Sequence, residues 1–170
     1  MELVYIIIKV LAASQVMLFV GLFAFSKNPV YVKGIGVTLM LAIIVYFFVP
    51  LLQQHLDVNS AQLVLALPSL IPMLTLIFVW ATFEEDRFVP KWLIGLFCID
   101  ILLTVWRVIH GYSSSEAELV AQLIKVFAAT YAIYVVWRGR ENDLVEMRVK
   151  ARLIFIGALS ITVLGVSLAE

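Results

Sequence analysis

Six long apolar runs, joined by short polar segments, make up almost the whole chain. They cover residues 3–25, 34–52, 61–83, 92–110, 118–137 and 151–169. Each run is close to the roughly 20 residues that an α-helix needs to cross a hydrocarbon core of about 30 Å. Transmembrane β-strands are about half as long and alternate in polarity, so the runs predict helices. The pattern predicts an all-α, multi-pass membrane bundle of six transmembrane helices, forming one domain over residues 1–170.

Composition mainly excludes functions. Of the 170 residues, 64% are hydrophobic and 14% are charged, whereas about a quarter of a typical soluble domain is charged. The chain has no catalytic triad, no HExxH sequence and no zinc-binding spacing, and its single cysteine, Cys98, lies in an apolar run. We therefore predict no enzyme activity, no metal and no cofactor.

Basic residues predict an orientation for the bundle. The first, third and fifth connections, together with Arg152 directly after the fifth, hold nine of the twelve Lys and Arg residues, and the second and fourth connections hold none. Because basic connections stay in the cytoplasm, the N-terminus is predicted to lie outside. This distribution in so compact a bundle favours a bacterial inner membrane.

Charged residues inside the spans are the first candidates for function, because charge in a membrane core is costly. At 1.5 Å per residue, Lys9 is predicted to lie about 9 Å below the outer surface, and Asp100 about 15 Å. Arg107 and Lys125 are predicted at about 5 and 11 Å, so all four groups belong to the outer half of the bundle. Thr104 lies on the same helical face as Asp100 and Arg107.

The fifth span has a matching polar face, formed by Glu118, Gln122 and Lys125. The fourth and fifth spans form a hairpin, so their polar faces are able to meet. We predict that Asp100 pairs directly with Lys125.

Two prolines, Pro68 and Pro72, interrupt the third span at a similar depth, about 10–16 Å from its outer end. Each removes a backbone donor, so the helix is predicted to bend there. A bent helix beside buried polar groups favours an outward-facing pocket. This pocket would set three positive charges against the one negative charge of Asp100. Such a balance favours a small anionic or zwitterionic ligand.

A purely structural interpretation of the same residues stays open. Asp100 and Lys125 would then form a neutralised pair that fixes helix register, while Lys9 and Arg107 extend to the outer headgroups. Replacing Lys125 by methionine distinguishes the two: an unchanged ligand response with lowered stability would exclude the pocket.

The fifth connection is the most distinctive polar segment, because it is dense in both charge signs. It is either a solvated turn whose arginines enforce topology or a contact surface for a cytoplasmic effector. The residues that would make this coupling surface are Arg138, Arg140, Asp143, Glu146, Arg148 and Arg152.

The pattern Arg-Gly-Arg-x-x-Asp-Leu-Val-Glu-x-Arg at residues 138–148 resembles the N-terminal membrane region of bacterial AraC-type transcription regulators. The resemblance implies a seven-helix membrane sensor that precedes a helix-turn-helix DNA-binding domain. Residues 1–170 would then be the sensor portion, without the seventh span or the DNA-binding domain, and would make no direct contact with nucleic acid.

We therefore expect a signal-sensing membrane domain that passes an outside or membrane-borne cue to a cytoplasmic transcription regulator. Two alternatives remain: a small transporter or channel subunit, and an accessory subunit of a larger membrane complex. Small residues of the sixth run, Gly157, Ala158 and Gly165, predict close helix packing or a homodimer face.

Overall fold

The protein folds as a bundle of helices, seen here in a computed structural model. The structure describes residues 10, 13–18, 20–21, 29–55, 58–84, 89–110 and 115–138. The described part contains no strand, which confirms the predicted all-α class. Its principal helices are α2 (Val30–His55), α3 (Val58–Ser69), α4 (Ile71–Phe83), α5 (Lys91–His110) and α6 (Ser115–Arg138).

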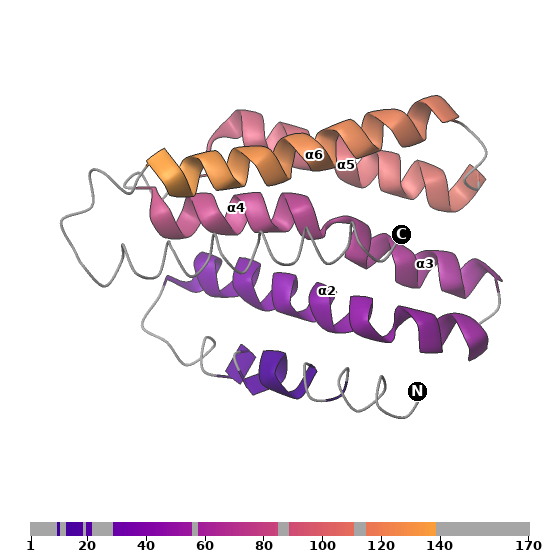
Figure 1. Cartoon of the computed structure of the whole chain (residues 1–170). Helices are drawn as coiled ribbons and strands as arrows, with labels where there is room; N and C mark the ends of the chain where they lie inside the picture. Colours follow the sequence, from indigo (N-terminus) through magenta and orange to yellow (C-terminus); the bar gives the residue numbers. More distant parts are fainter. Residues whose placement is uncertain are drawn as a thin grey trace.

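The broken pair α3 and α4 occupies the centre of the described bundle (Figure 1). Helix α2 packs along both segments. On the other side, α3 packs mainly on α5, whereas α4 packs mainly on α6. The break between α3 and α4 therefore lies where the central helix passes from one neighbour to the other.

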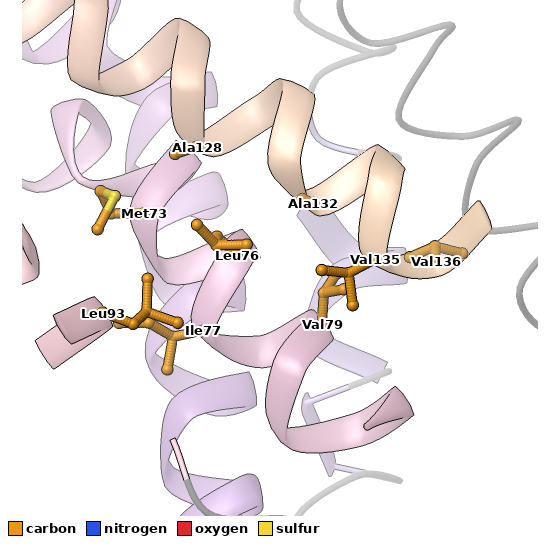
Figure 2. Close-up of a cluster of buried hydrophobic side chains, with 9 residues drawn as sticks. All are labelled: Met73, Leu76, Ile77, Val79, Leu93, Ala128, Ala132, Val135 and Val136. Atoms are coloured by element: carbon orange, nitrogen blue, oxygen red, sulfur yellow. The ribbon is translucent and has the colours of Figure 1, made fainter. Parts of the chain in front are cut away.

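The largest apolar cluster joins α4 to α6, with one contribution from α5 (Figure 2). Two of the four side chains that α6 contributes are small: Ala128 and Ala132 are both 0% exposed. Small side chains let two helix backbones approach closely, which increases dispersion contacts along the pair. The cluster consists of Met73, Leu76, Ile77, Val79, Leu93, Ala128, Ala132, Val135 and Val136.

Enlarging Ala132 to leucine is expected to destabilise the bundle by about 1–3 kcal/mol, because a well-packed interface has no room for the added methyl groups. Unfolding in lipid bicelles measures the effect. Thr130→Leu is the matched control, since Thr130 is an exposed residue of the same helix, and this change is expected to stay within about 0.5 kcal/mol. Equal effects of the two substitutions would contradict the packing assignment.

Aromatic side chains join α4, α5 and α6 at the end of the bundle where α4 ends and α5 begins. The rings of Trp80 and Tyr131 are stacked, with centroids 6.2 Å apart. Trp92 meets both rings edge-on, at 6.1 Å from Trp80 and 5.6 Å from Tyr131. Such contacts stabilise beyond the area that they bury, so this end of the three helices is held as a unit.

Large apolar side chains also cover the outside of the bundle. Leu102 and Ile109 of α5 are 68% and 70% exposed, and Leu123 and Val126 of α6 are 60% and 64% exposed. In the described part, three helices are long and apolar enough to cross a membrane, at Val30–Val49, Lys91–Ile109 and Glu116–Arg138. Only 17–28% of the positions in their most apolar windows are buried, so most of this apolar surface requires a lipid environment.

The helices can be compared with the predicted spans one by one. Helices α5 and α6 begin and end within three residues of the predicted runs 92–110 and 118–137. Helix α2 extends beyond 34–52 at both ends. Within 3–25 the described residues 10, 13–18 and 20–21 are helical, and 151–169 lies outside the described residues. The count of six spans and the outside N-terminus remain predictions.

Candidate functional site

The break between α3 and α4 forms one side of a polar site. At the break, Leu70 has φ −85° and ψ −6°. Its N–H donates to the carbonyl of Leu67 at 3.2 Å, and its carbonyl accepts from the N–H of Leu74 at 2.9 Å. Pro68 lies inside α3 and Pro72 lies in the first turn of α4. The helix is therefore interrupted between the two prolines, at the predicted bend.

Ser69 connects this break to α5. Its hydroxyl donates to the carbonyl of Ala66 at 2.8 Å. The same oxygen lies 3.3 Å from Oγ1 of Thr104, which is 7% exposed. Sequence reasoning did not select Ser69, although its position between two prolines was a signal that the residue lies at an interruption.

Asp100 is the central residue of the site. It is 0% exposed, and among the residues that the structure describes neither of its carboxylate oxygens has a hydrogen-bond partner. It lies one helical turn from Thr104 and near the middle of the 20-residue helix α5. A buried carboxylate without donors is costly. A charged residue of this kind inside an apolar helix is a candidate functional group.

Arg107 of α5 and Glu118 of α6 form an ion pair between the two helices. Nη2 of Arg107 lies 3.8 Å from Oε1 of Glu118. Asp100 lies seven residues before Arg107, and Lys125 lies seven residues after Glu118. In two antiparallel helices, Asp100 and Lys125 therefore lie at the same level, about 10 Å along the axis from the ion pair. The charges of Lys125 and Arg107 both act on Asp100.

The predicted direct pair between Asp100 and Lys125 is wrong. Within the described residues, no hydrogen bond reaches the Asp100 oxygens, and the ion pair between the polar faces joins Arg107 to Glu118. The Cα–Cβ bonds tilt toward each helix N-terminus, so facing side chains on antiparallel helices lean apart. The longer side chains of Arg107 and Glu118 overcome this divergence, whereas the short aspartate at position 100 does not.

The charges on the facing sides of α5 and α6 balance. Arg107 and Lys125 are positive, and Asp100 and Glu118 are negative. The excess of positive charge that the sequence predicted for the pocket did not count Glu118. It did count Lys9, which lies outside the described residues. The described site is therefore dipolar rather than positive, with one charge of each sign at the level of Asp100.

The remaining predicted residues are dispersed. Gln122 is exposed on α6, and no hydrogen bond joins it to the Asp100 oxygens. Arg138 is exposed at the end of α6. The other residues of the predicted coupling surface lie outside the described residues: Arg140, Asp143, Glu146, Arg148 and Arg152.

The ion pair is expected to contribute little to stability. A double-mutant cycle with Arg107→Gln and Glu118→Gln should give a coupling below about 1 kcal/mol, as for partly solvated pairs. The reasons are the N–O distance of 3.8 Å and the 42% exposure of the Glu118 side chain. Unfolding in bicelles measures the cycle, and a coupling of several kcal/mol would mean that the pair is desolvated in the bilayer.

Comparison with known proteins does not identify this site. No protein family, no curated protein and no solved structure matches the chain. In the part of the chain that the structure describes, no group of three or more His, Cys, Asp or Glu side chains is placed to hold a metal ion. The arrangement of Asp100, Ser69, Thr104 and Lys125 therefore has to be interpreted from its own chemistry.

Proposed function

We propose that this chain is a membrane-embedded sensing domain that binds a small polar solute between the α3–α4 break, α5 and α6. The observation that carries the proposal is Asp100, which is fully buried and has no hydrogen-bond donor among the described residues. Binding a solute with donor groups would offset the cost of burying that carboxylate. The break supports the proposal, because irregular backbone at membrane depth is tolerated where it lines a cavity or is covered by protein.

The proposed orientation places this site in the outer half of a bacterial inner membrane. It rests on the basic residues of the odd connections, with six spans and the N-terminus outside. In this orientation the aromatic contact of Trp80, Trp92 and Tyr131 faces the cytoplasm. It lies at the opposite end of α5 and α6 from the Arg107–Glu118 ion pair.

The proposed output is a change in the position of α6. Arg138 ends α6, and the charged segment that follows resembles the membrane region of AraC-type regulators. A solute changes this end only if it binds two helix arrangements with different affinity. The partner that would read the change is a cytoplasmic transcription regulator, joined to this chain or separate from it.

Spin labels test the proposal directly. Lys91 and Arg138 are exposed ends of α5 and α6, so both are changed to labelled cysteines in a Cys98→Ser background. Electron–electron distances are recorded in liposomes with glucose, acetate, methylammonium or glycine. One solute class is expected to shift the distance, Asp100→Asn should abolish the shift, and the exposed acid change Glu116→Gln should preserve it. No shift with any class would overturn the sensing function.

Transport is the second candidate, and the helix break favours it, because broken helices beside polar groups also build substrate paths. The same liposomes distinguish the two functions. A sensor binds solute without filling the vesicle, whereas accumulation that Asp100→Asn abolishes would identify a transporter.

A further inference from the structure

The hydroxyl groups beside the helix break have already used their hydrogens. A hydroxyl has one hydrogen and two lone pairs. Ser69 donates its hydrogen to the carbonyl of Ala66 at 2.8 Å, so in the 3.3 Å contact Thr104 is the donor and Ser69 the acceptor. Thr104 therefore keeps only acceptor capacity for any further partner.

Other groups around the break are acceptors as well. Both oxygens of Asp100 lack donors among the described residues. Pro72 has no amide hydrogen, so the carbonyl of Pro68 loses its usual helical partner four residues on. This side of the site is therefore rich in acceptors and poor in donors, and it matches a group with several N–H donors.

The charge balance restricts what carries those donors. Lys125 lies at the level of Asp100 and interacts with it electrostatically without a hydrogen bond. A simple cation would place a second positive charge close to Lys125 in a low-dielectric environment, and the repulsion between the two would be costly. A molecule with a positive and a negative end satisfies both residues and adds no net charge to the membrane.

We propose that the site binds a zwitterion of the amino-acid class, with a primary ammonium group at Asp100 and Thr104 and a carboxylate directed to Lys125. The inference rests on the proposed sensing function and adds the chemistry of the ligand. The ligand's ammonium group supplies three donors, which the side-chain carboxylate of Asp100 and the remaining lone pair of the Thr104 hydroxyl accept. The ligand's carboxylate accepts a hydrogen bond from the ammonium group of Lys125. That ammonium group makes no hydrogen bond to Asp100.

A matched series of probes tests the ligand class on the full chain in nanodiscs by calorimetry. Glycine, alanine and leucine present a primary ammonium group and a carboxylate. Glycine betaine keeps both charges but has no N–H donor, while acetate and methylammonium each keep one charge. Saturable binding is expected for at least one of the three amino acids and absent for the other probes. Binding of betaine, acetate or methylammonium instead, or of no probe at all, would overturn the inference.

Variants separate a direct contact from general damage. Thr104→Val is expected to weaken amino-acid binding about tenfold, the loss of one hydrogen bond to a charged group. Thr75→Val is the matched control, because Thr75 is also buried but belongs to α4, and it should leave the affinity unchanged. Lys125→Met should weaken amino-acid binding, and it should also lower stability somewhat because it removes a positive charge that acts on the buried carboxylate of Asp100. Equal affinity losses for the two threonine variants would overturn the assignment of the ammonium group to Thr104.

The two proposals fail in different ways. A distance change produced by acetate or glucose would leave the sensing function intact and exclude a zwitterion. Binding of glycine without any distance change would support the ligand class and exclude the sensing function.

Discussion

Replacing Asp100 by asparagine is expected to stabilise the bundle by about 1–3 kcal/mol and to abolish solute binding. The gain follows from removing a buried charge that has no donor, since a group of this kind carries its full desolvation cost. The loss of binding follows because the neutral amide has lost the charge that attracts a cationic group. Unfolding in bicelles and calorimetry in nanodiscs, on the same preparations, measure the two effects.

The sign of the stability change distinguishes the functional from the structural interpretation. If Asp100 formed a neutralised pair with Lys125, its removal would leave an uncompensated charge and cost about 3–5 kcal/mol. Glu118→Gln is the matched control, because Glu118 has an ion-pair partner at 3.8 Å. That change is expected to lower stability slightly. A loss of stability in Asp100→Asn would therefore contradict a functional, unpaired carboxylate.

The helices of the bundle were largely readable from the sequence. Runs of about 20 apolar residues bounded by charge predict α5 and α6 closely, because length and hydropathy decide whether a segment is helical in lipid. The bend in the third span was readable from Pro68 and Pro72. On the side away from α2, α3 packs on α5 while α4 packs mainly on α6. The sequence did not predict this exchange of neighbours, because apolar surfaces of similar composition do not specify their partners.

The sequence predicted which residues form the polar site but did not predict the contacts between them. Depth and helical face brought Asp100, Thr104, Arg107 and Lys125 to one region. Which side chains touch depends on their length and on the tilt of the Cα–Cβ bonds, so the pair formed is Arg107 with Glu118. Spacing along the two helices predicts the level of each residue. It does not predict the distance between side-chain donor and acceptor atoms, which decides whether a hydrogen bond forms.

Replacing Pro72 by alanine is expected to restore a continuous helix across Leu70 and to weaken solute binding at least about tenfold. The alanine amide would donate to the carbonyl of residue 68 and remove the clash of the proline ring with that carbonyl, a contribution of about 3 kcal/mol in a helix interior. Straightening the helix would move Ser69 relative to Thr104. Their hydroxyl oxygens are already 3.3 Å apart, so a further increase would break this hydrogen bond. A displacement of about 1 Å is enough to lose much of a site's affinity.

Pro68→Ala is the matched control, and its expected result follows from the position of the break. A proline disturbs the turn that precedes it, so Pro72 acts on residues 68–72, where Leu70 interrupts the helix. Pro68 acts on residues 64–68, which remain helical in α3. Removing the ring of Pro68 should therefore leave the break and the binding affinity in place. Hydrogen exchange of the amides of Leu70 and Ile71, together with calorimetry, measures both variants. If Pro68→Ala and Pro72→Ala weakened binding equally, the site would depend on the rigidity of the segment rather than on its interruption at Leu70.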